Sequence, residues 1–191
     1  MIEVDDMNNK GFTLVEILAM LVVLGILMAV AIPNITGIMR NNRLNGYKGD
    51  AKQMVEKTNI MVSKTKSIKK PEIGECLIFT LDYLNTNDDL TAGPNGGLYD
   101  QEESFVVYTR QGQKYNYYVR LIEEVDGNRL GMDFVKSDLI DNLTTEDIDE
   151  VSETYGISKT NTEEENINLL TGAPFDTTCS PGGVKKVYIR K

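Results

Sequence analysis

The longest apolar stretch of the chain lies near its start, from Phe12 to Pro33. Thr13 and Glu16 are its only polar residues, and from Ile17 onward it carries no charge. A helix of this length rises roughly 30 Å, about the thickness of the hydrocarbon core of a bilayer. The pattern therefore predicts a membrane-spanning helix over residues 12–33 with one carboxylate near its beginning.

Beyond Pro33 the pattern becomes that of an amphipathic helix. Residues of one face recur at three- and four-residue spacing, and the opposite face is charged. That face consists of Leu44, Tyr47, Ala51, Met54, Val55, Thr58, Met61 and Val62. Lysines and then Pro71 indicate the C-terminus of the helix. We expect one helix from Phe12 to about Lys69, kinked at Pro33, whose second half packs on a globular domain.

The rest of the chain favours strands. Residues 104–124 are rich in β-branched and aromatic side chains and contain a turn at 110–113, which predicts a β-hairpin. Further strands are expected at 130–135 and 184–190, and residues 76–81 suit a strand or a short helix. Short helices are expected around 137–143 and 145–155, and residues 85–97 and 158–168 are expected to be solvated loops. The pattern predicts an α+β fold in which a long helix packs on an antiparallel sheet.

Composition excludes several classes of function. The net charge is −9, and nucleic-acid binding needs clustered Lys and Arg. The chain has no His, which removes the usual general base and the commonest metal ligand. It also lacks a metal-ligand cluster, a calcium-loop register and a phosphate-binding glycine loop. We therefore expect no enzyme activity, no cofactor and no metal.

Glu16 is the most informative polar residue, because a carboxylate inside an apolar span is costly and suggests a function. It lies four residues after Phe12, roughly 6 Å along a helix. A chain cut between Gly11 and Phe12 would gain an α-amino group that attracts a Glu16 carboxylate where water is excluded. The alternative is that Glu16 lies at the headgroup level and reaches into water.

The order Lys10-Gly11-Phe12-Thr13-Leu14-Val15-Glu16, followed by the long apolar run, resembles the type IV pilin family and its pseudopilins. The resemblance covers about fifty residues, through the first helix. It implies that a prepilin peptidase cuts after Gly11, that Phe12 is N-methylated and that Glu16 assists filament assembly. It also implies helix-loosening roles for Gly25 and Pro33.

The resemblance also implies a pilin fold and a division of the chain. Residues 1–11 would be a cytoplasmic leader that is removed, 12–33 the transmembrane and filament-core half of the helix, and 34–70 its amphipathic half. Residues 71–191 would form the globular domain, with an acidic insertion at about 136–170. Met7 is an alternative start. The positive-inside rule favours the opposite orientation, because Arg40, Arg43 and Lys48 follow the span.

Cys76 and Cys179 flank most of the predicted strands. Outside the cytoplasm they could pair and close a loop of about a hundred residues. The resemblance points to the C-terminal disulfide loop of many pilins, although the first Cys often lies later there. The sequence alone leaves their pairing open.

The resemblance implies a structural subunit of a type IV pilus, held in the cytoplasmic membrane as a prepilin and then assembled into an extracellular filament. Its partners would be other pilin subunits, the prepilin peptidase, the assembly platform and lipid. A minor pilin is favoured over the major one, because the acidic insertion would hinder tight lateral packing. The alternatives are a pseudopilin of a type II secretion or competence system, and a soluble secreted binding domain released after Ala31 by signal peptidase.

Overall fold

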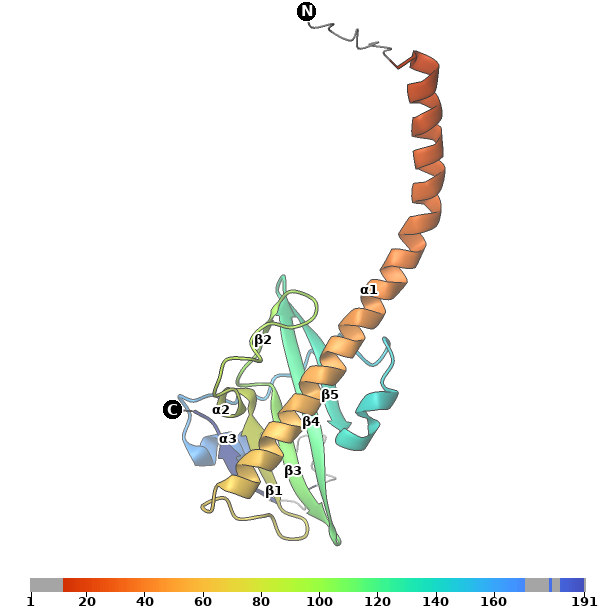
Figure 1. The fold of residues 1–191 in the computed structure, drawn as a ribbon. Coiled ribbons are helices and arrows are strands. Elements are labelled where there is room, and N and C mark those ends of the chain that lie inside the picture. The colour runs from red at the N-terminus through yellow and green to blue at the C-terminus, as the bar shows by residue number, and fades with distance from the viewer. Residues whose placement is uncertain (1–11, 171–178, 180–182, 191) are drawn as a thin grey trace, which may run out of the picture. The chain divides into compact units, whose positions relative to one another are not determined.

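The computed structural model describes residues 12–170, 179 and 183–190, without the side chains of residues 30–35. The chain divides into two compact units, 1–40 and 41–191. The helices are α1 (Leu14–Lys64), α2 (Leu81–Leu84), the 3-10 helix η1 (Ser137–Asn142) and α3 (Glu163–Leu169). The strands are β1 (Cys76–Thr80), β2 (Leu98–Tyr99), β3 (Phe105–Gln111), β4 (Lys114–Val125), β5 (Asn128–Lys136), β6 (Asp149–Glu150) and β7 (Val184–Tyr188), as labelled in part in Figure 1.

The predicted first helix is confirmed, and its backbone stays helical through Pro33. It ends at Lys64 rather than near Lys69. Ile68 explains the earlier end, because its side chain is buried and its N–H bonds Thr65 O at 3.0 Å, which closes a tight turn. The lysines that follow therefore lie on a loop.

The sheet has the strand order β6-β5-β4-β3-β1-β7, and β2 pairs with β4. All pairs are antiparallel except β1 with β7. The predicted hairpin is confirmed as β3 and β4, and Gly112 adopts a φ of 61° in its turn, which suits glycine. The last strand in the sequence, β7, lies at one edge of the sheet beside β1.

The two faces of the central strands are both buried. Leu77, Phe79, Val106 and Tyr108 lie in one core cluster with Tyr47, Ala51 and Met54 of α1. The neighbouring residues on the same strands, Cys76, Ile78, Phe105 and Val107, lie in a second cluster. Figure 1 shows the second half of α1 lying across β1, β3 and β4. Because side chains alternate along a strand, each cluster takes every second residue.

Residues 158–168, expected to be a solvated loop, are largely exposed, but they run into α3, so only the loop part of that expectation is wrong. The residues that flank them cover the second face of the sheet. Tyr155, Ile157 and Leu170 are buried in the second cluster. The helix expected at 145–155 is also wrong, because residues 145–148 form turns and bends, β6 follows, and the rest has no regular structure. Its backbone donors are bound by the sheet: Val151 N–H donates to Arg129 O, and Tyr155 and Ile157 N–H donate to the Glu103 carboxylate. A helix would have to give up these bonds.

Candidate functional site

The N-terminal end of α1 is closed by a capping box between Thr13 and Glu16. The Glu16 carboxylate accepts from Thr13 N–H and from Thr13 Oγ1–H, both at 2.9 Å, and Glu16 N–H donates to Thr13 Oγ1 at 3.3 Å. This arrangement satisfies donors that a helix start otherwise leaves without partners. The sequence reasoning missed it, although Thr followed three residues later by Glu is the signature of such a cap.

The apolar residues around this cap and after it are exposed on every side of the helix. The exposed fraction rises to 85% at Leu14 and is still 45% at Ile17, the lowest of the set. The set comprises Phe12, Leu14, Val15, Ile17, Leu18, Met20, Leu21, Val22, Val23, Leu24, Ile26, Leu27 and Met28. A helix that is apolar all round needs lipid or other helices around it. The candidate functional site is therefore this segment with its cap.

The sequence analysis also assigned roles to Gly11, Gly25, Ala31 and Pro33. Of these, the structure describes the surroundings of Gly25 alone. A Cβ built on Gly25 would meet no atom within 4 Å, so its surface is open to a neighbouring helix. Gly11 lies outside the described residues. The side chains of Ala31 and Pro33 are likewise outside the description.

Cys76 and Cys179 form a disulfide with a Cα–Cα distance of 5.8 Å. Both side chains are buried in the second core cluster. The bridge joins β1 to the segment that precedes β7, so it fastens the parallel edge of the sheet. Both cysteines lie in the unit 41–191, so we expect the bridge to stabilise that unit.

A buried carboxylate, Glu123, ties α1 to the sheet and to the loop before β2. It accepts from Tyr47 Oη–H at 2.6 Å, from Asn95 N–H at 3.0 Å and from Gly97 N–H at 2.7 Å. Burial and the neighbouring Glu123 carboxylate raise the pKa of Tyr47, so its hydroxyl stays a donor. Nothing in the sequence pattern brings these residues together, because Tyr47 and Glu123 are 76 positions apart.

A buried cation, Arg120, holds the second cover of the sheet. Its guanidinium donates to Asp133 Oδ1 at 2.6 Å and to Glu153 O at 2.5 Å, and lies 4.5 Å from the centroid of the Tyr155 ring. Glu103 Oε2 lies 3.9 Å from Arg120 Nη2. Like the Glu123 cluster, this cluster joins elements of the fold, because its charged groups bind one another and the backbone.

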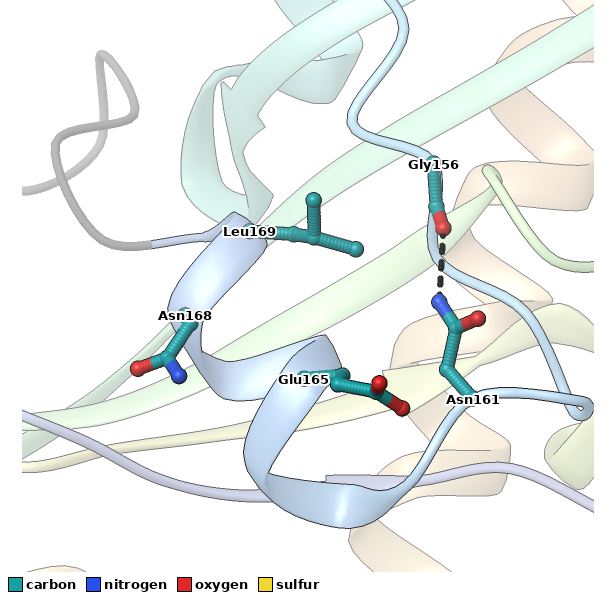
Figure 2. A pocket seen from close by; sticks show the side chains of 5 residues that line it. All are labelled: Gly156, Asn161, Glu165, Asn168 and Leu169. Atoms are coloured by element: carbon teal, nitrogen blue, oxygen red, sulfur yellow. Dashed lines mark hydrogen bonds between the residues drawn. The ribbon is translucent and has the colours of Figure 1, made fainter.

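Figure 2 shows a hollow of about 570 Å³ beside α3. Asn161 Nδ2–H donates to Gly156 O there at 3.0 Å, and Glu165 is engaged in capping Thr162. Asn168 and Leu169 complete the lining. Covalent catalysis needs at least a nucleophilic side chain beside a base. The residues that line this hollow include no such pair. In the described part of the chain, no three His, Cys, Asp or Glu are placed to hold a metal ion.

Within the described residues, none of the helices combines the length and the apolarity needed to cross a membrane. No curated protein and no solved structure matches the chain. A family model, the prokaryotic N-terminal methylation motif, matches residues 6–32. These residues include the cap and most of the exposed apolar helix. The chain thus carries at residues 6–32 the class III signal of type IV pilins and pseudopilins.

Proposed function

We propose that this chain is a structural subunit of a type IV pilus. The observation that carries the proposal is the exposed apolar helix that begins at the Thr13–Glu16 cap, inside the matched methylation motif. The α+β unit that follows, with α1 across a largely antiparallel sheet, supports a pilin-like fold. The prepilin would be anchored in the cytoplasmic membrane by residues 12–33, cleaved after Gly11 and methylated on Phe12.

Assembly then exchanges one apolar environment for another. Hydrophobic burial changes little when the helix leaves lipid for a filament core, so packing and electrostatics must supply the preference. In the single chain the Glu16 carboxylate is engaged with Thr13. A Phe12 amine on a neighbouring subunit would offer this carboxylate a positive partner. Gly25 and Pro33 would let the helix adjust during the transfer.

A pseudopilin of a secretion or competence system carries the same motif, and the Phe12 start and the size of the chain favour a pilus subunit over it. A minor subunit is favoured over the major one by the acidic residues of segment 136–170. A soluble secreted domain that begins at Ile32 is the alternative of another class. Copy number in sheared filaments separates minor from major subunits.

The experiment combines N-terminal sequencing of the extracellular form with three variants. N-methyl-Phe12 supports the filament subunit, and Ile32 would contradict it. Glu16→Ala removes both the charge and the cap. Glu16→Gln keeps a capping side chain and removes only the charge, and Thr13→Ala weakens the cap and keeps the charge.

If the charge carries assembly, both Glu16 variants are cleaved normally but reach filaments at least about tenfold less than wild type, which corresponds to about 1.4 kcal/mol. Thr13→Ala then assembles much better than either. Assembly of Glu16→Gln at the wild-type level would show that the carboxylate serves only as a cap.

A further inference from the structure

Six cations gather at one end of the unit 41–191. One ends α1, three follow it, and two flank the turn between β3 and β4. They are Lys64, Lys66, Lys69, Lys70, Arg110 and Lys114. The sequence has no Asp or Glu at 64–71 or at 104–114. The lysines are exposed and Arg110 is half-buried. We call these six residues the basic end.

The two segments of the basic end share one surface. Gly74 N–H donates to Arg110 O at 3.2 Å, which joins the loop after α1 to the hairpin. Lys70 Nζ lies 5.5 Å and Arg110 Cζ 5.6 Å from the centroid of the Tyr115 ring. Figure 1 shows the loop and the hairpin tip at the same end of the sheet. Two of the positive charges therefore lie beside an exposed aromatic ring.

These cations have no carboxylate partners in the described part of the chain, unlike other cations of the unit. Within the described residues, none of the six forms an ion pair, whereas Lys52, Lys57 and Lys136 each do. Like charges held close together repel, so an anionic partner would lower the free energy of this surface.

The same chain carries a complementary surface. Residues 137–158 contain seven acids and no Lys or Arg. Of these acids, Glu146, Asp149, Glu150 and Glu153 are exposed and form no ion pair within the described residues. A hollow of about 320 Å³ opens here. Its lining, which we call the acidic groove, is Gly131, Asp133, Asp147, Asp149, Glu150, Val151, Ser152 and Glu153.

The two surfaces cannot neutralise each other within one copy. Lys114 begins β4, whereas β6 pairs with β5 at Leu130 and Gly131, which pair with Glu123 and Ile122 of β4. The strand rises about 27 Å from Lys114 to Ile122 at ~3.4 Å per residue. That is about three Debye lengths at physiological ionic strength, so the attraction is screened.

We propose that the basic end of one copy docks on the acidic groove of the next copy. The inference rests on the proposed function, because it places the contact between neighbouring subunits of a filament. The two surfaces differ, so the contact is head-to-tail, and such a contact extends without closing unless its rotation closes a ring. The contact requires neighbouring copies of this chain, which the copy number in sheared filaments tests.

Charge exchange tests this contact in cells that express the full-length chain. Lys69→Glu with Lys70→Glu reverses the basic end, and Asp149→Lys with Glu150→Lys reverses the acidic groove. Each pair should reduce the amount of the chain in sheared filaments at least about tenfold, because like charges then face each other. All four substitutions together should restore the amount to within about threefold of wild type. Disulfide-bonded, N-methylated chain in the membrane confirms folding and processing of each variant.

Two further measurements sharpen the result. Glu56→Lys with Glu164→Lys changes the net charge as the groove reversal does, at two exposed acids away from both surfaces, and should assemble like wild type. A zero-length carbodiimide links a lysine amine to a carboxylate that it contacts. Applied to wild-type filaments and followed by digestion, it should join the peptide that contains Lys69 and Lys70 to the peptide that contains Asp149 and Glu150. Within one copy these groups are too far apart to react.

The outcomes separate this contact from the proposed function. Filaments of N-methyl-Phe12 chains without the cross-link, or without recovery in the fourfold variant, overturn the contact and leave the pilus subunit standing. The contact is also wrong if Lys69→Glu with Lys70→Glu filaments assemble normally but lose binding to added double-stranded DNA, because the basic end then faces a polyanion. A secreted chain beginning at Ile32 overturns both.

Discussion

The two units use apolar side chains in opposite ways. In the unit 41–191, Tyr47, Ala51 and Met54 of α1 are fully or almost fully buried against the sheet. In the unit 1–40, the same helix exposes Leu14, Leu24 and their apolar neighbours. One helix therefore contains a half whose partner lies in the same chain and a half that needs partners from outside. We therefore expect a mutation in the C-terminal half of α1 to act on folding, and, under the proposed function, a mutation in its N-terminal half to act on insertion and assembly.

The largest expected effect concerns the disulfide. Cys76→Ser with Cys179→Ser should lower the free energy of unfolding of the unit 41–191 by up to about 4 kcal/mol, because the bridge closes a loop of 103 positions. Denaturant unfolding of the full-length chain in detergent measures the loss. Reduction of wild type should reproduce it and leave the variant unchanged, whereas equal stability of oxidised and reduced wild type would contradict it. The proposed cleavage after Gly11 should not depend on the bridge.

Arg120→Met should cost about 3 kcal/mol of unfolding free energy, because it leaves Asp133 and Glu103 without their buried cation. Arg110→Met is the matched control at a half-buried position and should change this free energy by less than about 0.5 kcal/mol. The same denaturant unfolding compares the two. Equal losses would mean that the buried cluster contributes nothing beyond an ordinary surface arginine.

In the unit 1–40, Leu24→Arg should disfavour membrane insertion by about 3 kcal/mol, because it places a charge near the middle of the apolar helix. Unfolding of the unit 41–191 should not change. Ile60→Arg, at an exposed position in the second half of α1, is the control and should leave insertion intact. Fractionation of membranes after expression measures both, and membrane retention of Leu24→Arg equal to wild type would remove the distinction between the two halves.

The smallest effect concerns pH. A hydrogen bond from Lys57 lowers the pKa of Asp89 below its usual value, so the pair stabilises the fold above about pH 4 and this contribution is lost as the pH falls below it. Asp89→Asn should cost about 0.5 kcal/mol at pH 7, since the pair is partly exposed to solvent. Unfolding at pH 7 and pH 3 measures it. A difference between wild type and variant that persists undiminished at pH 3 would contradict the ion pair.

Local patterns predicted the elements that depend on local sequence. The three- and four-residue spacing in α1 and the alternation in the β3–β4 hairpin were sufficient for both. The segment 145–155 was misread as a helix, because the pattern does not reveal that Asp149 and Glu150 pair with β5 and that the Glu103 carboxylate binds the N–H of Tyr155. The Thr13–Glu16 cap was readable and was missed.

Long-range pairing was beyond the sequence. Nothing local indicates that β1 lies between β3 and β7, or that Glu123 binds Tyr47 and Asn95. Such contacts depend on which elements meet in space rather than on the period of their side chains. The candidate site was recognised from one motif, whereas the basic end and the acidic groove needed the loop, the hairpin and the edge strand to be placed.

Both edges of the sheet are blunt. β6 has two residues, and β7 presents Lys185 and Lys186 to solvent. At β6 an added strand could form only a few hydrogen bonds, and at β7 it would meet two lysine charges. Both features discourage the addition of a strand from another molecule. Copies of this chain are thereby hindered from joining edge to edge into a continuous cross-β sheet.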